Sequence, residues 1–210
     1  MKSFEGYCTD VFFDEAMSFI EKNRERPFFC YLAPNAPHYL YNVPEKYCSS
    51  YRGKMSDDRA QFFGMISNLD ENFGRLRRHL EKLGIAEDTI LVYETDNGTS
   101  CGCSLDSEQQ VNEGFNAGMR GINCSPYEGG HREPFFIKWN EGNIKGGREI
   151  SQLTANVDFM PTILDLCGID VPDGRTFDGV SLAPLLLDEK AEWVERTVVT
   201  DSQRLVRPKK

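Results

Sequence analysis

The stretch that decides the fold is ILVYETDNG, residues 90–98. It starts as a run of β-branched, aliphatic and aromatic residues, which is typical of a buried strand. It then breaks at Asp96, Asn97 and Gly98, which are residues of an exit loop. Because α/β sheets keep their binding sites at the carboxyl ends of strands, we expect a candidate site at this loop.

A long amphipathic helix precedes this strand. Apolar residues recur from Phe62 to Leu83 with the spacing of one helix face. Asp57 or Asp58 offers a start, and Gly84 stands where a terminating glycine belongs. The pattern predicts about seven turns of helix.

Two earlier segments extend the pattern. A helix is predicted from Thr9 or Asp10 to about Asn23, and residues 28–33 form an apolar run of strand length. The order helix, strand, helix, strand implies right-handed crossovers. The predicted fold class is α/β, with a mostly parallel mixed sheet and helices on both faces.

The second half of the chain is less regular. Residues 99–118 form a long polar connection, and a loop of that length is usually functional or mobile. Beyond it we predict a strand over 135–139, a helix with Asp158 as its cap, and a last strand over 197–200.

Composition excludes several classes of protein. The chain has 210 residues, of which 40% are apolar, so we expect residues 1–210 to form a single unit with a partly frayed tail over 188–210. A net charge of -9 argues against a nucleic-acid partner. No apolar run reaches the roughly 20 residues that cross a bilayer, and no signal peptide is recognised, so no membrane partner is expected.

Seven cysteines form an odd set without the paired CxxC spacing of a structural zinc site. Cys30 and Cys167 lie in apolar runs, so we expect both in the core. Cys101 and Cys103 form either a metal or redox motif or two unrelated residues, and a single Cys-x-Cys lacks the further ligands of a zinc site. The sequence determines neither the disulfide state nor the oligomeric state.

Asp96 and Asn97 carry hard oxygen atoms of the kind that calcium takes, but calcium binds about six to eight ligands. Two neighbours cannot complete such a site. An ordinary turn with Asn97 in a left-handed conformation explains the same residues.

Two other loops can meet an anion. His38 lies in a proline-flanked loop after the 28–33 segment, where it can donate a proton to an anionic substrate or be a plain surface residue. Residues 128–132, EGGHR, either direct amides and a guanidinium toward an anion or form a structural turn in which Arg132 pairs with a carboxylate of the chain.

Four segments in fixed order resemble the formylglycine-dependent sulfatases of the alkaline phosphatase superfamily. They are PFFCYLAPNAPH at 27–38, TDNG at 95–98, MRG at 119–121 with YEGGHREP at 127–134, and LTANVD at 153–158 with PTIL at 161–164. The resemblance extends from about Tyr7 to Leu187. It implies an arylsulfatase-like fold of which this chain is the carboxyl-terminal portion, with the amino-terminal part missing.

The resemblance also implies roles for individual residues. Asp96 and Asn97 would be two of the calcium ligands, and His38 would contact the sulfate and help the ester oxygen leave. The substrate would be a sulfate ester, either a small molecule or a sulfated glycan, and the missing amino-terminal half of the domain would be a partner. The candidate substrate-binding residues are Asn123, His131 and Arg132.

The nucleophile is the first departure from this family. Its members use a cysteine in a Cys-x-Pro-x-Arg segment, oxidised to formylglycine, and no such segment is encoded here. Residues 124–128, CSPYE, have Glu128 in place of the arginine, and we interpret them as a coincidence. The family's amino-terminal pair of acidic metal ligands is absent as well, so the Ca²⁺ site is incomplete in this chain.

Asn123 is the second departure, because similar sulfatases carry a lysine at this position before the Glu-Gly-Gly segment. A carboxamide still donates hydrogen bonds but gives up a full charge facing the sulfate. Weaker transition-state stabilisation would follow, and it raises the question whether activity is lost.

Three hypotheses are therefore open. The chain is part of a sulfuric ester hydrolase and inactive alone, a non-catalytic sulfatase-like binding or structural protein, or a phosphate or phosphonate ester hydrolase of the same superfamily. Substrate identity does not follow from the sequence, although the 99–118 connection is the natural place for specificity. Family members are commonly exported, but the localisation of this chain is left open.

Overall fold

The computed structural model describes residues 3–144, 146–188, 190–193 and 195–199. These residues divide into two compact units, the first formed by residues 3–86 and 95–133 and the second by residues 87–94 and 134–199. Folding of the chain as a single unit stays a prediction. Residues 189, 194 and 200–210 of the predicted tail lie outside the described residues.

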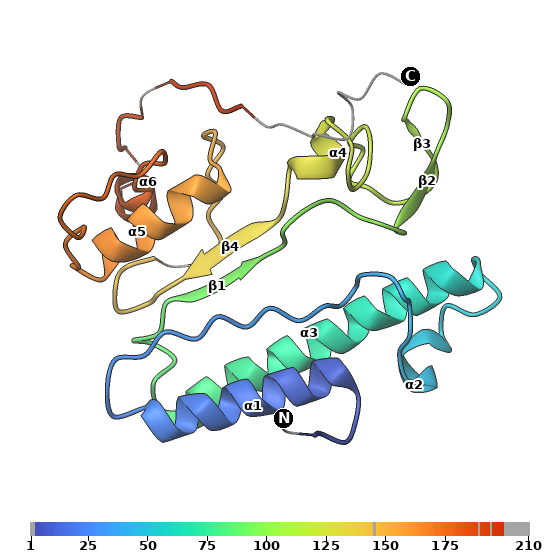
Figure 1. Ribbon diagram of the computed structural model, residues 1–210, viewed down its shortest axis with the longest axis horizontal. Coiled ribbons are helices and arrows are strands. Elements are labelled where there is room, and N and C mark those ends of the chain that lie inside the picture. Colours follow the sequence, from blue (N-terminus) through green and yellow to red (C-terminus); the bar gives the residue numbers. More distant parts are fainter. Residues whose placement is uncertain (1–2, 145, 189, 194, 200–210) are drawn as a thin grey trace. The chain divides into compact units, whose positions relative to one another are not determined.

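Two helices that lie side by side form the base of the first unit, and both match the sequence-based expectation (Figure 1). They are α1, Cys8–Asn23, and α3, Asp57–Leu83. The Ser56 side chain caps α3 by accepting from the Arg59 amide, and Gly84 ends the helix with a φ of 73°.

Polar side chains are buried between these two helices. Asn68 and Asn72 of α3 are 0% and 1% exposed, and each donates from its Nδ2 to Asp10 of α1, at 2.8 and 2.7 Å. Phe13 and Ile20 are buried on α1 nearby. The helix pair is therefore joined by hydrogen bonds to a carboxylate as well as by apolar contact.

A third helix packs against α3. It is the short α2, Glu45–Cys48, and its Tyr47 and Cys48 form a core cluster with Val43 and with Met65 of α3. The partly buried Tyr41 packs against the same cluster, so the loop that follows His38 is attached to the core.

The segment predicted as a second buried strand, residues 28–33, is not a strand among the described residues. It is irregular backbone in which Phe29 and Tyr31 are 64% and 73% exposed. The apolar composition suggested burial, but a strand also requires a neighbour that pairs with its backbone groups, and no described segment does so. Cys30 is half-buried rather than a core residue.

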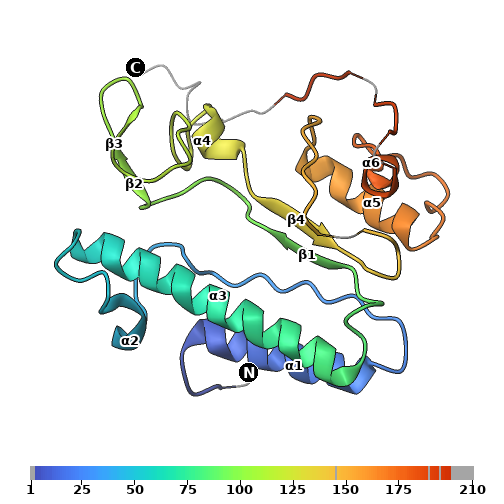
Figure 2. The same cartoon turned by 180° about the vertical axis from the view of Figure 1, so that it is seen from behind.

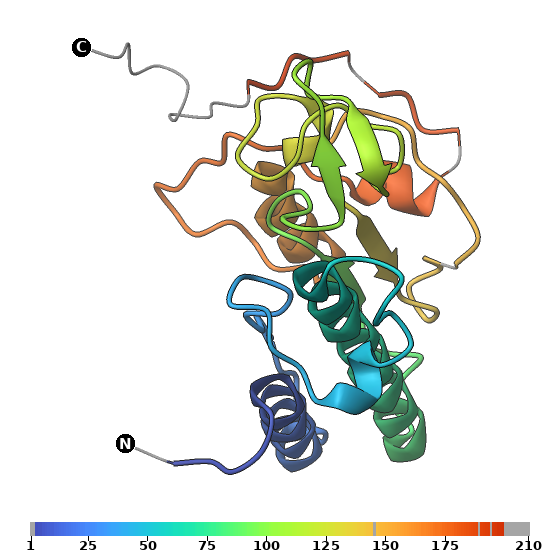
Figure 3. The same cartoon turned by 90° about the vertical axis from the view of Figure 1, so that its right-hand side faces the viewer.

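The 99–118 connection is more ordered than its composition suggested. It contains an antiparallel hairpin of β2, Cys103–Leu105, and β3, Val111–Gly114, seen as two adjacent arrows in Figure 3. The unit also contains the one-turn helix α4, Glu128–His131.

The second unit is built on one antiparallel strand pair (Figure 2). Strand β1, Leu91–Glu94, pairs with β4, Phe135–Lys138, with Val92 opposite Ile137. Both strands were predicted. The expected parallel pairing is absent from the described residues, where both ladders are antiparallel.

Helices cover this strand pair through one apolar cluster. After the 3-10 turn η1, Asn156–Asp158, come α5, Phe159–Leu166, and α6, Ala183–Leu187. The cluster joins residues of the strand, the loops and both helices: Ile137, Trp139, Ile144, Ile150, Leu166, Leu182, Leu186 and Trp193.

Three local predictions for this unit are wrong. Asp158 does not cap α5 with its side chain, because its carboxylate instead accepts the amides of Ala155 and Val180. Cys167 is exposed, and residues 197–199 form no strand. Within the described ranges, no helix is long and apolar enough to cross a membrane.

Candidate functional site

The loop after β1 packs directly against α4. The Gly98 amide donates to the Gly130 carbonyl at 3.2 Å, and a Cβ placed on Gly98 would lie 1.8 Å from the Gly129 carbonyl oxygen. No side chain fits at such a separation, so position 98 requires glycine. The backbone beside Asp96 and Asn97 is thereby joined to the EGGHR turn.

The segment that carries Asn123 joins the same two elements. The Asn123 amide donates to the Thr99 carbonyl at 3.0 Å, and the Gly129 amide donates to the Arg120 carbonyl at 2.8 Å. Three sequence motifs, at 95–98, 119–123 and 128–132, therefore meet through backbone contacts. We call this arrangement the glycine junction.

The His38 loop is attached to the same part of the unit through Tyr41. The Tyr41 hydroxyl donates to Ser100 Oγ at 3.2 Å, three positions after Asn97 in the chain. His38 itself is exposed, its amide donates to the Asn35 carbonyl, and its Nδ1 lies 2.5 Å from the Tyr39 carbonyl oxygen. Its Nε2 atom is the nitrogen not engaged by that contact.

Asp96 and Asn97 lie side by side at the carboxyl end of β1. Asn97 Nδ2 donates a hydrogen bond to Asp96 Oδ2 at 2.7 Å. Asp96 Oδ1 and Asn97 Oδ1 are not part of this bond and are available as metal ligands. Their chemistry fits calcium, which prefers carboxylate and amide oxygens. Their number does not complete a site, since no group of three or more His, Cys, Asp or Glu side chains in the described residues is placed to hold a metal ion.

Glu133 belongs to this environment, although sequence reasoning did not select it. Its Oε2 accepts from Thr95 Oγ1 at 2.9 Å, and its buried Oε1 has no hydrogen-bond partner among the described residues. Burial raises the pKa of Glu133, the Thr95 hydroxyl opposes that effect, and the nearby Asp96 charge adds to it. The only hint in the sequence was the place of Glu133 within the YEGGHREP segment.

The candidate substrate-binding residues differ in their exposure and in whether their side chains already have a partner. Arg132 Nη1 pairs with Glu128 Oε2 at 3.3 Å, as in the structural interpretation of this turn, although both side chains are largely exposed. His131 is exposed at the end of α4. Asn123 is half-buried, and its Oδ1 accepts from the Cys124 thiol at 2.8 Å.

Cys101 and Cys103 are not joined by a disulfide, and none of the seven cysteines, all within the described residues, forms one. Burial raises the pKa of both thiols, with the Arg59 guanidinium opposing the effect. Protonated thiols are poor metal ligands and poor nucleophiles, so neither cysteine has the properties of a reactive group.

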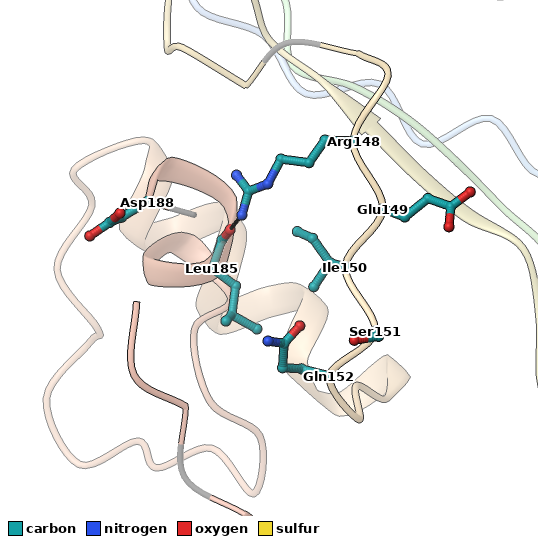
Figure 4. Close-up of a pocket in the computed structure, with 7 residues that line it drawn as sticks. All are labelled: Arg148, Glu149, Ile150, Ser151, Gln152, Leu185 and Asp188. Carbon is teal, nitrogen blue, oxygen red and sulfur yellow. Dashed lines mark hydrogen bonds between the residues drawn. The ribbon is translucent and has the colours of Figure 1, made fainter. Parts of the chain in front are cut away.

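Two cavities lie among residues of the second unit, away from these motifs in the chain. One, of about 300 Å³, is lined mainly by residues 148–152 with Leu185 and Asp188 (Figure 4). Arg148 donates from both terminal nitrogens to the Leu185 and Leu186 carbonyls at the end of α6, so its charge is already engaged. The cavity contains none of the predicted site residues.

Comparison with known proteins bears on the motifs that meet at the glycine junction. Residues 2–169 match the family model described as Sulfatase. This chain belongs to the sulfatase family. It is 31% identical over 191 residues to the uncharacterized sulfatase YdeN of Escherichia coli (strain K12), with 89% of this chain and 32% of that protein covered.

Other relatives have named substrates. Over 200 residues the sulfatase-family chain is 31% identical to the N-acetylgalactosamine-6-sulfatase of Mus musculus, covering 94% of this chain and 36% of that protein. Over 174 residues it is 32% identical to the steryl-sulfatase of Rattus norvegicus, and the match covers 82% of this chain and 29% of that protein. The chain spans about a third of the length of the curated relatives it matches.

Solved structures agree with the family assignment. Ps i-CgsB in complex with k-i-k-neocarrahexaose has a TM-score of 0.76 and 28% sequence identity, over 87% of this chain and 39% of that chain. BT4656 in complex with its substrate D-glucosamine-2-N,6-O-disulfate has a TM-score of 0.66 and 22% sequence identity, over 89% of this chain and 53% of that chain. At this identity the match shows likeness of fold alone. The alkaline phosphatase-like sulfatase fold implied by the motifs is confirmed.

Proposed function

We propose that this chain contributes part of the active site of a sulfuric ester hydrolase and does not turn over a sulfate ester by itself. The observation that carries the proposal is the glycine junction, because close backbone contacts bring three sulfatase-like motifs together. A surface turn would not need backbone packed so closely that a Cβ on Gly98 would lie 1.8 Å from the Gly129 carbonyl oxygen. This packing favours a built site over an ordinary turn.

The proposed roles follow from the atoms that each residue leaves available. Asp96 and Asn97 would hold calcium, whose charge would face the sulfate oxygens. His38 would donate a proton to the departing ester oxygen, since its Nε2 is not engaged by the Tyr39 carbonyl. The nucleophile, the formylglycine of related enzymes, and the remaining calcium ligands would come from the amino-terminal half of the domain.

The proposed substrate is a sulfated glycan or a smaller sulfate ester. Relatives named for N-acetylgalactosamine-6-sulfate and the solved structure in complex with k-i-k-neocarrahexaose support a sugar ester. The steryl-sulfatase relative supports a broader class. The hairpin within residues 99–118 would contact the part of the substrate that differs between a sugar ester and a steryl ester.

The three histidines of the chain provide a direct test. We expect sodium sulfate, at constant ionic strength set by sodium chloride, to shift the imidazole NMR signals of His38 and His131. His79, on α3, is the matched control and should not respond. Signals that respond equally at all three histidines, or at none, would contradict the proposed sulfate site.

One observation favours a second candidate, a sulfate-ester-binding protein without catalysis. Asn123 is neutral where related sulfatases have a lysine, and its carbonyl oxygen is already occupied by the Cys124 thiol. A complete domain carrying Asn123→Lys separates the two candidates. Hydrolysis of 4-nitrophenyl sulfate that rises about a hundredfold or more supports the enzyme, since that is the order expected for one electrostatic contact, whereas no hydrolysis by either form supports the binding protein.

A further inference from the structure

Two exposed apolar side chains directly follow His38. Tyr39 is 60% exposed and Leu40 is 70% exposed. Single exposed apolar residues are common on protein surfaces, so exposure alone indicates nothing. What distinguishes this pair is the way in which Tyr39 is held.

A ladder of aromatic rings connects Tyr39 to the core. The Tyr39 ring meets the Tyr41 ring edge to face, with centroids 5.5 Å apart and planes at 86°. Tyr41 in turn meets Phe62 of α3 at 5.8 Å and 84°, and Phe62 is only 4% exposed. We call Tyr39, Tyr41 and Phe62 the aromatic ladder.

The aromatic ladder is also attached to the other side of the candidate site. The hydroxyl of Tyr41 donates to Ser100 Oγ at 3.2 Å, on the segment that follows Asn97. The outermost ring, Tyr39, is thus fixed from beneath beside a residue proposed to contact the sulfate. A ring fixed in this way loses little conformational entropy when a ligand covers its exposed face.

We propose that Tyr39, with Leu40 beside it, is the platform on which the ring of the sulfate ester substrate stacks. The proposal rests on the proposed function, because it assumes that His38 contacts the sulfate group. Tyr39 is then a specificity-determining residue that selects esters whose sulfate is carried by a ring, either aryl or pyranose, over esters of simple alcohols. The ring faces the platform while the sulfate faces His38.

The experiment compares sulfate esters with and without a ring. The chain is titrated with methyl sulfate, 4-nitrophenyl sulfate and galactose 6-sulfate, and dissociation constants are taken from the His38 imidazole signal. We expect the two ring esters to bind about fivefold to tenfold more tightly than methyl sulfate, which is the range of one aromatic stacking contact. Tyr39→Ala should bring the ratio to about one and leave the methyl sulfate constant unchanged.

Two further variants make the result specific. Tyr39→Trp keeps a flat ring and should preserve the ratio. Tyr31→Ala removes a tyrosine that is even more exposed, at 73%, but lies outside the ladder, and it should also preserve the ratio.

The outcomes separate this inference from the proposed function. An unchanged ratio in Tyr39→Ala, or an equal loss of methyl sulfate binding, would overturn the platform while sulfate binding at His38 still stands. Failure of methyl sulfate and inorganic sulfate to shift His38 in the unmodified chain would overturn the proposed function, and the platform with it.

Discussion

At the scale of single residues, Gly98 matters because of the atom that it lacks. Its amide bonds to Gly130, and the Gly129 carbonyl occupies the space where a side chain would begin. Neither contact involves a functional group of the kind that motif searches select. The position of Asp96 nevertheless depends on it, since Asp96 lies two residues before Gly98 and its carboxylate is bonded to Asn97 of the same short loop.

Gly98→Ala is therefore expected to lower the free energy of unfolding of the first unit by about 1–3 kcal/mol, as overpacking does. Urea unfolding followed by far-ultraviolet circular dichroism measures the change. Gly74→Ala, within α3, is the matched control and should be neutral or stabilising, because its new methyl group would meet only the end of the Arg78 side chain. Equal destabilisation by the two variants would argue against a steric requirement at Gly98.

In the second unit, local structure depends on the charge of one buried side chain, the carboxylate of Asp158. The side chain is 0% exposed, and it accepts two amides and the guanidinium of Arg196. Burial raises its pKa, but the Arg196 guanidinium and the two amides outweigh burial and hold the pKa below its ordinary value. A lowered pKa in the folded state means that the carboxylate stabilises the fold at neutral pH and loses that effect as the pH falls through the folded value.

Asp158→Asn should accordingly lower the free energy of unfolding at pH 7 by about 3–5 kcal/mol, the usual effect of breaking a buried ion pair. The difference between variant and unmodified chain should shrink as the pH falls below about 4. Tryptophan fluorescence during urea unfolding reads this unit, because both tryptophans of the chain, Trp139 and Trp193, lie in it. The exposed Asp173→Asn serves as the control and should change nothing at either pH.

At the scale of elements, α3 organises the first unit. Along one side it pairs with α1, and near its start Arg59 reaches the hairpin of β2 and β3. Arg59 is 7% exposed and donates to the Cys101 carbonyl and to Ser104 Oγ, and it pairs with Glu113 at 2.8 Å. One buried side chain therefore fixes both strands of the hairpin.

Arg59→Met should free this hairpin, because it leaves the Cys101 carbonyl and the Ser104 hydroxyl without their donor. We expect a loss of about 2–4 kcal/mol in the local stability of residues 103–114, measured by amide hydrogen exchange. Arg77→Met, at an exposed position of the same helix, is the control and should cost about 1 kcal/mol or less. Similar protection of the hairpin in both variants would show that Arg59 does not hold it.

The helices could be predicted from the sequence because their signals are local. Asp57 or Asp58, Gly84 and the apolar stripe between them reflect physics within one helix, so the bounds of α3 followed almost to the residue, although the capping Ser56 was not selected. The hairpin could not be predicted in the same way. Its strands are three and four residues long, and their order comes from Arg59, more than forty positions away in the chain.

The residues of the candidate site also differ in whether a local sequence signal selects them. Asp96 and Asn97 were found because they directly follow a strand, and His38 because prolines flank it. Glu133 was not found, since its burial and its bond to Thr95 appear only once two distant segments meet. The strand predicted over residues 28–33 was wrong for a different reason. Apolar composition predicts burial, but it does not provide a partner strand.

At the scale of the whole molecule, the described surface carries large apolar side chains in more than one place. Phe29, Tyr31 and Phe136 are each at least 64% exposed, and two of them belong to residues 28–33, which pair with no strand in the described ranges. Exposed apolar area and unpaired extended backbone both favour association with other molecules.

The native chain should therefore bind an environment-sensitive dye such as anilinonaphthalene sulfonate. Phe29→Ser combined with Tyr31→Ser should lower the dye fluorescence, because it removes two of the large exposed apolar side chains. Phe115→Ser, which removes one exposed ring of 72%, is the control and should have a smaller effect. A monomeric chain that melts cooperatively and binds no dye would contradict the expectation of exposed apolar surface.

The bond between Asn97 and Asp96 gives the molecule an internal competitor for cations. Asn97 Nδ2 donates to Asp96 Oδ2, so the amide already neutralises part of the charge that a metal ion would use. A cation that takes Asp96 Oδ2 as a ligand competes with this bond. The Nδ2 proton of Asn97 that faces Asp96 is therefore a spectroscopic reporter, because its chemical shift should change when a cation displaces the bond.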